Sequence, residues 1–513
     1  MSHIKTAALI LLSVIFFTSC EMEKEPYDIN PKSSGISVVE KIEEKSDGEE
    51  TSGQDEPSQN IYNEYNITLE INPETSIVKG IQKVNYHNRT GERLKTLCFN
   101  LYLNAFSKDS DYQPYFQEFR DTIFYSGREY GYINITSVFV DGEAAPFTTD
   151  ITKLEIDLVD GLMPYKDTQI TLQFEAYIPK INHRTGSNRN AMWFGSFIPV
   201  VSVYEGGEFR VDPYYKAGDP FYAESANYTV SIKAPKIYKA IGAGNETIKE
   251  DQDSTTTIFT AKMVRDFAFA LIDRNYRSIS VTTKDGVDIN MYYISDIDNV
   301  DYIITGAKNA MEFFSAYVGS YPYEKFDIVE AGMFIPAGME YSQLTFIDGK
   351  YLKTASATRT ISHEIAHQWF YNVVGSDQIK SPWLDEGLAS FLQEKIFYPD
   401  MESLRKKIEV DYQRLSAMPA LSYKLSDDLS VYKNWSDYYN VQYAKSKIML
   451  YTLNAKMGEE NFSKFIKEYY SNYSFKIAQP SDFIKTAEDV YGESLQDFFD
   501  TWLYGEKLPP LYF

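Results

Sequence analysis

Hydrophobic and polar residues alternate along the chain from about residue 61 onward. Apolar side chains fall at every second position over 65–71, and a turn at Asn72-Pro73-Glu74 separates them from a second run over 77–86. This period of two is typical of a strand with one buried face. Runs of the same kind recur at 154–158, 170–177 and 228–232. The pattern predicts an N-terminal antiparallel β-sandwich or saddle-shaped sheet over residues 61–273.

The period changes to that of a helix after about residue 274. Within 301–317, apolar residues recur three or four positions apart, as at Ile304, Ala307 and Met311. A short strand is expected over 326–329, and further helices over 446–457 and 495–503. We therefore predict an α+β multidomain chain, in which a mostly helical domain over residues 274–513 follows the β domain.

Residues 1–20 have the pattern of a secretory signal. His3 and Lys5 precede an apolar run over 7–17, which is shorter than the roughly 20 residues that span a bilayer. The run ends in Phe17-Thr18-Ser19-Cys20, which resembles a bacterial lipobox although Leu is more usual than Phe at its first position. We expect lipidation of Cys20 and attachment to the bacterial cell membrane on its extracytoplasmic side. The alternative is an ordinary signal peptide that is cleaved near Ser19.

Composition predicts an acidic spacer after the signal and argues against a nucleic-acid partner. Residues 21–60 hold twelve Asp and Glu against four Lys, with Tyr27 as the one aromatic, and this composition predicts a disordered acidic spacer. The net charge of -23 argues against a nucleic-acid partner, which requires clustered cations. Because Cys20 is assigned to lipidation, we expect no disulfide, and Cys98 is interpreted as a small buried hydrophobic residue.

The main chemical signal is His363-Glu364-Ile365-Ala366-His367. On a helix, positions i and i+4 share one face, so both imidazoles can bind the same zinc ion. A catalytic zinc keeps one position open and lowers the pKa of water there to about 7. Glu364 stands beside the first ligand, where it can accept the proton of that water and pass it to a leaving amine. The pattern therefore predicts a zinc peptidase.

A third ligand is expected on the next element. Eighteen residues separate His367 from Glu386, which begins a helical pattern that continues to Ile396. Two antiparallel helices joined by a loop would bring this carboxylate beside the two imidazoles. The other histidines of the mature chain, His87 and His183, lie in the strand-rich half and are interpreted as structural.

These motifs resemble those of the M1 zinc aminopeptidases, which belong to the gluzincins. The chain resembles a short bacterial lipoprotein form of this family. The stretch Trp383-Leu384-Asp385-Glu386-Gly387 differs from the family's Trp-Leu-Asn-Glu-Gly only in Asp385. Ala337-Gly338-Met339-Glu340-Tyr341 corresponds to the family's Gly-x-Met-Glu-Asn motif, and Tyr443-Ala444-Lys445 matches the segment of its catalytic Tyr. The resemblance covers residues 61–513, including Asp212-Pro213-Tyr214, 218–222 and the tail at 498–503.

The resemblance implies a thermolysin-like catalytic domain with one zinc ion per chain. It implies that Glu340 binds the free α-amine of a peptide and that Tyr443 donates its phenol hydrogen to the oxyanion of the intermediate. Gly338 and Met339 would shape the strand against which the substrate backbone pairs. The implied partners are peptides with a free N-terminus.

Some alternatives and departures stay open. A zinc endopeptidase and a catalytically dead surface binding protein share the same fold, while nothing supports an additional lipid-epoxide activity. Tyr341, in place of the family's Asn, is expected to narrow the first substrate pocket or to change how the amine is held. No second amine contact is found, although 193–208 is where we expect it. The chain stops after the catalytic domain, which predicts a more open site. The sequence does not reveal the preferred N-terminal residue or the oligomeric state.

Overall fold

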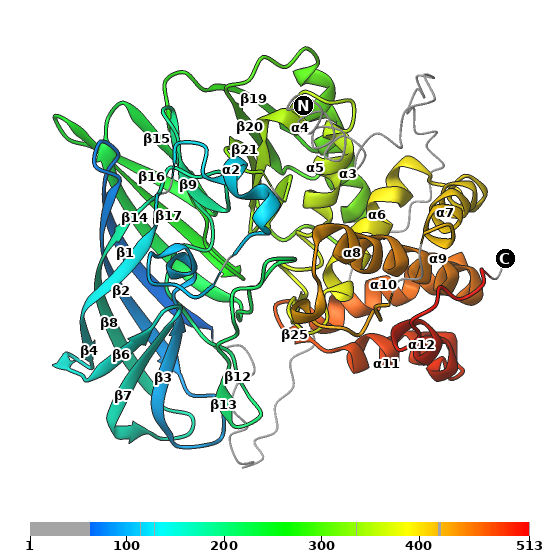
Figure 1. The fold of residues 1–513 in the computed structure, drawn as a ribbon, viewed down its shortest axis with the longest axis horizontal. Coiled ribbons are helices and arrows are strands. Elements are labelled where there is room, and N and C mark those ends of the chain that lie inside the picture. The colour runs from blue at the N-terminus through cyan, green and yellow to red at the C-terminus, as the bar shows by residue number, and fades with distance from the viewer. Residues whose placement is uncertain (1–61, 113, 128, 335, 419–421, 512–513) are drawn as a thin grey trace, which may run out of the picture. The chain divides into compact units, whose positions relative to one another are not determined.

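The computed structural model describes residues 62–112, 114–127, 129–334, 336–418 and 422–511 (Figure 1). The predicted signal peptide, Cys20 and the acidic tether lie outside the described residues. Residues 60–513 form one compact unit, so the predicted division at residue 273 stays a prediction. Within the described part of the chain, no helix has the length and apolar character needed to cross a membrane.

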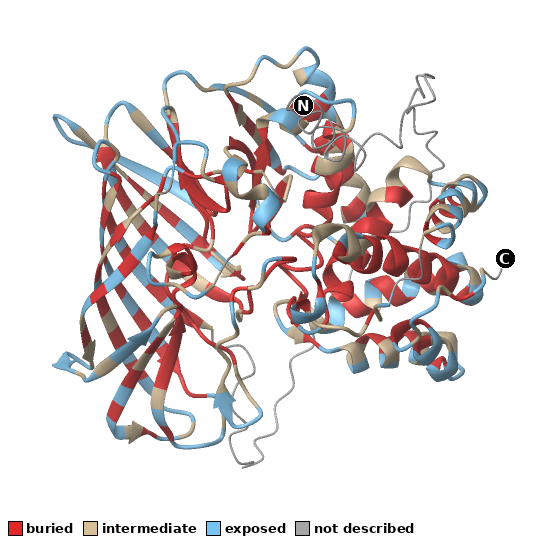
Figure 2. Ribbon diagram, in the orientation of Figure 1, coloured by how far each residue is buried: buried red, intermediate tan, exposed pale blue. Residues whose placement is uncertain are grey.

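An eight-stranded sheet is the largest element of the N-terminal half. Its strand order is β16-β17-β14-β1-β2-β8-β4-β5, and all neighbours are antiparallel except β1 and β14. Buried and exposed residues alternate without exception along β1, as its period of two predicts (Figure 2). The strands are β1 (Asn63–Asn72), β2 (Ile77–His87), β4 (Tyr132–Val140), β5 (Glu143–Ala144), β8 (Asp167–Tyr177), β14 (Ala226–Pro235), β16 (Asn245–Glu250) and β17 (Ser254–Val264).

Two four-stranded sheets and a hairpin complete this half. The sheet orders are β15-β18-β10-β9 and β11-β3-β7-β6, and β12 pairs with β13. Apolar side chains from all three larger sheets meet in one core, to which β1 contributes Leu69, β7 contributes Ile156 and β18 contributes Phe269. The strands are β3 (Leu94–Asn100), β6 (Phe147–Asp150), β7 (Lys153–Leu162), β9 (Thr185–Ser187), β10 (Ala191–Phe194), β11 (Val200–Val201), β12 (Tyr204–Glu205), β13 (Glu208–Phe209), β15 (Tyr238–Gly242) and β18 (Phe269–Asp273). Short helical turns lie at η2 (Tyr102–Phe106), η3 (Gln117–Phe119) and α2 (Arg120–Ile123).

A mixed five-stranded sheet opens the C-terminal half. Its order is β19-β20-β21-β23-β22, so β22 lies at one edge. The strands are β19 (Arg277–Thr282), β20 (Asp288–Tyr293), β21 (Lys325–Ala331), β22 (Gly338–Tyr341) and β23 (Leu344–Asp348). The antiparallel pairing of β22 with β23 places Glu340 opposite Thr345.

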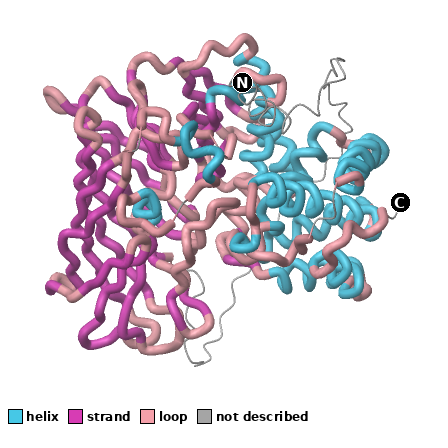
Figure 3. The backbone as a smooth tube through the Cα atoms, viewed as in Figure 1, coloured by secondary structure: helices cyan, strands magenta, loops and turns pink. Residues whose placement is uncertain are grey.

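Helices make up most of the remaining chain, and Figure 3 shows them on the side away from the large sheet. The predicted helix over 301–317 is α3 (Val300–Tyr317), and the predicted one over 446–457 is α9 (Ser446–Met457). The others are α4 (Gly349–Leu352), α5 (Ala357–Ala366), α6 (Leu388–Phe397), α7 (Met401–Ser416), η5 (Leu429–Val431), α8 (Trp435–Tyr438), α10 (Glu459–Tyr473), α11 (Pro480–Tyr491) and α12 (Gln496–Leu503). A short pair, β24 (Gly375–Ser376) and β25 (Ile477–Ala478), joins the loop after α5 to the segment after α10.

Two π-helical turns precede helices at the predicted site. Trp383–Gly387 forms η4 directly before α6, and Tyr439–Lys445 forms η6 directly before α9. A π-turn widens the helix by one residue and is frequent at functional sites. Glu386 and Tyr443 therefore lie in π-turns rather than in regular helix, a detail that apolar periodicity does not register.

Candidate metal centre

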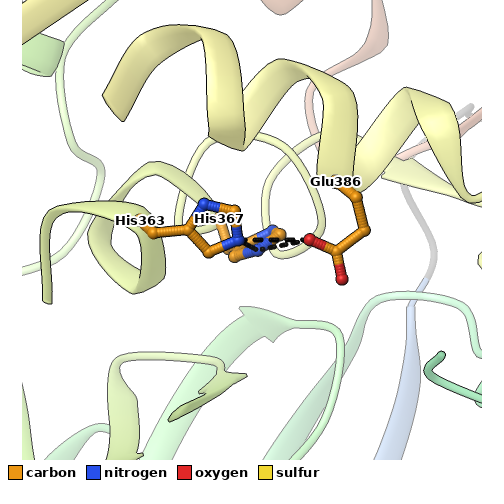
Figure 4. A group of neighbouring side chains, drawn as sticks. All are labelled: His363, His367 and Glu386. Carbon is orange, nitrogen blue, oxygen red and sulfur yellow. Dashed lines mark hydrogen bonds and ion pairs between the residues drawn. The ribbon is translucent and has the colours of Figure 1, made fainter. Parts of the chain in front are cut away.

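The two imidazoles of the motif and Glu386 converge on one point (Figure 4). His363 Nε2 lies 3.1 Å from His367 Nε2 and 3.1 Å from Glu386 Oε2. His367 Nε2 lies 3.5 Å from the same carboxylate oxygen. Ligands held at about 2.0–2.1 Å by a tetrahedral zinc stand about 3.3 Å from one another. The three donor atoms therefore fit a zinc ion in both chemical type and spacing.

Helix α5 fixes the relative placement of the two imidazoles. His363 lies in its last turn and His367 is its C-cap residue, so their rings come from one helix face with centroids 4.7 Å apart. Glu386 comes from η4, and all three residues are buried. The predicted convergence of helix and downstream carboxylate is what the structure shows.

A carboxylate orients the second imidazole. His367 Nδ1 lies 2.6 Å from Asp385 Oδ1 and 3.2 Å from the carbonyl oxygen of Phe370. Both neighbours accept hydrogen bonds, so Nδ1 carries the hydrogen and Nε2 presents its lone pair to the metal position. His363 Nδ1 has no hydrogen-bond partner among the described residues. The two ligands are thus held differently, with His367 the more tightly oriented.

The electrostatics of the cluster favour a cation at this position. Burial alone raises the pKa of Glu386, but hydrogen bonds and charge from the two histidines outweigh it and hold that pKa below its ordinary value. Burial lowers the pKa of His367, yet Asp385 and Glu340 outweigh it and raise that pKa well above its ordinary value. A dication bound between these carboxylates would supply the positive charge that they favour.

Glu364 faces the edge strand β22. The carboxylate is buried, and its Oε2 has no hydrogen-bond partner among the described residues. A Cβ at position 338 would overlap this carboxylate, so only Gly338 lets β22 approach it so closely. Burial raises the pKa of Glu364 to about 8, and the charge of a bound metal would lower it.

Glu340 lies on the same face of β22 as Gly338. Side chains of a strand alternate, so positions 338 and 340 face Glu364 while 339 and 341 face away. Oxygen and nitrogen atoms of Glu340, Glu364 and His367 all lie within 4.8 Å of one another. The predicted amine ligand is therefore a buried carboxylate beside the predicted metal position.

Met339 and Tyr341 occupy the opposite face of this strand. Met339 Sδ lies 3.1 Å from Arg184 Nε, and the Tyr341 ring packs 5.3 Å from that of Phe346. The hydroxyl end of Tyr341 fills the space that a Cβ of Gly195 would take. Tyr341 thus packs between the two halves of the unit, and its effect on the first substrate pocket or on how the amine is held stays a prediction.

Tyr443 points into the site. Its hydroxyl donates to Glu386 Oε1 at 2.5 Å, and its ring stacks on His363 with centroids 5.4 Å apart. Burial, followed by the charge of Glu386, raises the pKa of Tyr443 well above its ordinary value. The phenol therefore keeps its hydrogen at neutral pH and is available as a donor.

Several contributing residues escaped the analysis of the sequence. Asp219 forms a buried 2.5 Å ion pair with Arg184, and its charge is the largest influence after burial in raising the pKa of Glu340. Gln378 donates to Glu340 Oε1 at 3.1 Å. Asp219 lies in the stretch 218–222, to which the resemblance gives no role, whereas no motif marks Gln378. In the stretch 193–208, Gly195 lies against Tyr341, whereas the hydrogen bond to Glu340 described above comes from Gln378, outside this stretch.

The remaining histidines lie elsewhere. His87 Nδ1 is 2.6 Å from Asp167, and the buried His183 ring packs 4.7 Å from Phe106. Among the described residues, the groups whose atoms could share a metal are His363, His367 and Glu386, and the overlapping set Glu340, Glu364 and His367. Cys98 is buried and free, in agreement with its interpretation as a small hydrophobic residue.

Comparison with known proteins places this site in a family. Residues 302–502 match the profile of the peptidase family M1 domain. Endoplasmic reticulum aminopeptidase 1 of Mus musculus is 26% identical over 275 residues, which are 49% of this chain and 28% of that protein. Aminopeptidase M1-B of Oryza sativa is 24% identical, over 56% of this chain and 35% of its own length. The chain thus spans about a third of the length of the curated relatives that it matches.

A solved structure matches over most of both chains. An M1 zinc metallopeptidase from Deinococcus radiodurans superposes with a TM-score of 0.67 at 17% identity, covering 88% of this chain and 95% of that one. A two-domain M1 zinc metallopeptidase bound to L-arginine gives a TM-score of 0.66 at 16% identity. The fold is that of these two-domain metallopeptidases, and the two histidines and one glutamate that converge here could hold a metal ion. Residues 302–502, which carry the site, form a domain that matches peptidase family M1.

Proposed function

We propose that this chain is a zinc-dependent aminopeptidase that removes N-terminal residues from peptides. The observation that carries the proposal is Glu340, a buried carboxylate with an oxygen within 4.8 Å of His367 and of Glu364. A carboxylate fixed at this distance pairs with the α-ammonium group of a peptide and leaves no room for further residues on that side. The metal centre supports a peptidase, and Glu340 supports the exopeptidase.

His363, His367 and Glu386 would hold the zinc ion. When bound, zinc supplies the Lewis acidity that polarises the scissile carbonyl and makes water a nucleophile near neutral pH. Glu364 accepts the proton that the attacking water loses and passes it to the nitrogen as the carbon–nitrogen bond breaks. Tyr443 donates a hydrogen bond to the oxyanion that forms when the carbon–oxygen bond is made. Edge strand β22 offers its backbone to the substrate.

The proposal is tested with an aminoacyl substrate and its N-acetylated counterpart. We expect the wild type to cleave only the free amine and to lose activity with a chelator. Glu340→Gln should lower kcat/KM for the free amine by about 10–100-fold, mainly through KM, since a hydrogen bond to a charged group is worth about 1.5–3 kcal/mol.

Glu330→Gln is the matched control. Glu330 is also a buried glutamate of the same sheet, but it accepts hydrogen bonds from Ile294 and Ser295 instead of facing the site. Equal cleavage of the acetylated substrate would establish an endopeptidase instead. A wild type that shows no chelator-sensitive release of amino acids would establish a binding protein without activity.

We also propose that lipidation of Cys20 attaches the enzyme to the extracytoplasmic side of the bacterial membrane. The support is the apolar run followed by Phe17-Thr18-Ser19-Cys20 and the acidic stretch after it. A Cys20→Ala variant should move from the membrane fraction to the soluble fraction. Retention of the variant in the membrane fraction would contradict the proposal.

A further inference from the structure

A single side-chain amide lies between two buried carboxylates beside the metal centre. Gln378 Nε2 donates to Glu340 Oε1 at 3.1 Å and to Asp385 Oδ2 at 2.6 Å. Gln378, Glu340 and Asp385 are 2%, 3% and 1% exposed, so solvent does not compete for these hydrogen bonds. Both hydrogens of one nitrogen are used, one for each carboxylate.

Asp385 extends this contact to the metal ligand. Its second oxygen, Oδ1, accepts from His367 Nδ1 at 2.6 Å. The hydrogen bonds therefore run without interruption from Glu340 through Gln378 and Asp385 to His367. This series of hydrogen bonds has the predicted amine ligand Glu340 at one end and the predicted zinc ligand His367 at the other.

We propose that Gln378 and Asp385 are positioning residues that couple recognition of the substrate amine at Glu340 to the orientation of the zinc ligand His367. This inference rests on the proposed aminopeptidase function. Glu340 Oε1 and Asp385 Oδ2 both act as hydrogen-bond acceptors, so these two buried oxygens stay close only because a donor lies between them. The amide orientation is fixed by the same requirement, because the reverse orientation would point Oε1 at both anions.

The loop that carries Gln378 is held in place by the contacts of the neighbouring residue. The neighbouring Asp377 accepts from the backbone nitrogens of Ile379 and Lys380 at 3.0 Å each. It also forms an ion pair with Arg210, which belongs to the N-terminal half. Gln378 is thus held by backbone turns as well as by its own hydrogen bonds.

The free end of the amide borders a small cavity. Gln378 Oε1 has no hydrogen-bond partner among the described residues. Gln378 lines an internal cavity of about 30 Å³ together with Ser376, Arg265 and Tyr371. This volume accommodates a water molecule, which can donate to Oε1. A water there would satisfy this oxygen without disturbing the two hydrogen bonds that Nε2 donates.

The chain of hydrogen bonds also accounts for Asp385, where the resemblance implies Asn. An aspartate accepts from Gln378 and His367 at once, one oxygen for each. An asparagine has one carbonyl oxygen, so its amide hydrogens would face the donor of Gln378 or that of His367. Gln378 and Asp385 are thus complementary, and a change in either should be felt by the other.

The experiment uses the full chain with Gln378→Met, Asp385→Asn and the double substitution. Zinc dissociation constants are measured by competition with a chelator, without substrate, and kcat and KM are measured with a free aminoacyl substrate. We expect Asp385→Asn to weaken zinc binding by about 10–100-fold. Gln378→Met should raise KM more than it lowers kcat and should weaken zinc binding several-fold. The loss of zinc affinity in the double variant should be smaller than the product of the two single losses, because both residues belong to the same series of hydrogen bonds.

Matched variants separate positioning from general stability. Gln82→Met removes an equally buried amide that donates to the carbonyl of Pro199 in the N-terminal half. Asp327→Asn alters a buried carboxylate that accepts from Asn290. Neither should change zinc affinity or KM. If Gln378→Met does not fold, Gln378→Glu is used instead. It keeps the size of the side chain but places a third carboxylate between Glu340 and Asp385. It should weaken zinc binding and raise KM.

The outcomes that overturn the inference are distinct from failure of the proposed function. Zinc affinity and KM that stay at wild-type values in Gln378→Met or Gln378→Glu would overturn it, as would single losses that multiply fully in the double variant. A wild type that binds zinc but does not cleave a free aminoacyl substrate would overturn the aminopeptidase proposal. The zinc titrations need no turnover, so they would still decide whether Asp385 and Gln378 orient His367.

Discussion

Replacing Glu364 with Gln is expected to lower kcat by about 10²–10⁴-fold, the usual contribution of a positioned acid–base group. The substitution keeps the size of the side chain, which matters because Gly338 leaves no spare room against it. An amide cannot accept the proton of the attacking water at neutral pH. Turnover of a free aminoacyl substrate, measured with zinc content and thermal midpoint, tests this expectation.

The metal should remain bound in this variant, because Glu364 is not one of the three converging ligands. Glu330→Gln serves again as a control for changing a buried glutamate of the same half. A Glu364→Gln protein that holds zinc and keeps more than a tenth of wild-type kcat would contradict the assignment. Loss of zinc together with activity would instead make Glu364 part of the metal site.

The repeating patterns of the sequence predicted the elements well, because period two and helical spacing record local burial. The alternation over 65–71 became β1, with every second residue buried. The spacing of His363, His367 and Glu386 also predicted their convergence, since helix geometry fixes the first pair and a following helix brings the third. What these patterns could not show is what each face of the edge strand β22 packs against. Gly338 lies against Glu364, whereas Tyr341 lies against Gly195 of the N-terminal half.

The contributions of Asp219 and Gln378 could not be predicted for a different reason. Each acts through contacts between segments distant in sequence, such as the ion pair of Asp219 with Arg184 and the hydrogen bond from Gln378 to Glu340. Neither residue type is unusual, and neither sits in a motif with a known spacing. Only the assembled fold shows that Asp219 and Glu340 are buried carboxyl groups. Burying such a group without a hydrogen-bond donor or counter-charge would cost considerable free energy.

The N-terminal half takes part in the site through these contacts. Arg184 touches Met339 on one side and pairs with Asp219, while Arg210 pairs with Asp377 beside Gln378. Both arginines thus fix segments that carry or flank Glu340 and its partner. Loops of the N-terminal half therefore help to position Glu340 and Gln378 relative to the predicted metal position.

The Tyr443 hydroxyl provides the second large effect. Tyr443→Phe is expected to lower kcat by about 10²–10³-fold, the usual loss for one oxyanion donor, with little change in KM. The ring stacked on His363 is preserved in phenylalanine, so the metal ligands should stay in place. Single-turnover and steady-state rates with a free aminoacyl substrate, at saturating zinc, measure the loss.

Tyr439→Phe is the control for this substitution. Its ring stacks on Tyr443 with centroids 5.1 Å apart, but it is 40% exposed. Removing its hydroxyl should leave kcat unchanged. A Tyr443→Phe enzyme with wild-type kcat and raised KM would show that the hydroxyl binds the ground state, because only an interaction confined to the transition state lowers kcat without changing KM. The hydroxyl already points at Glu386 Oε1 at 2.5 Å, so little movement separates it from an oxyanion at the metal centre.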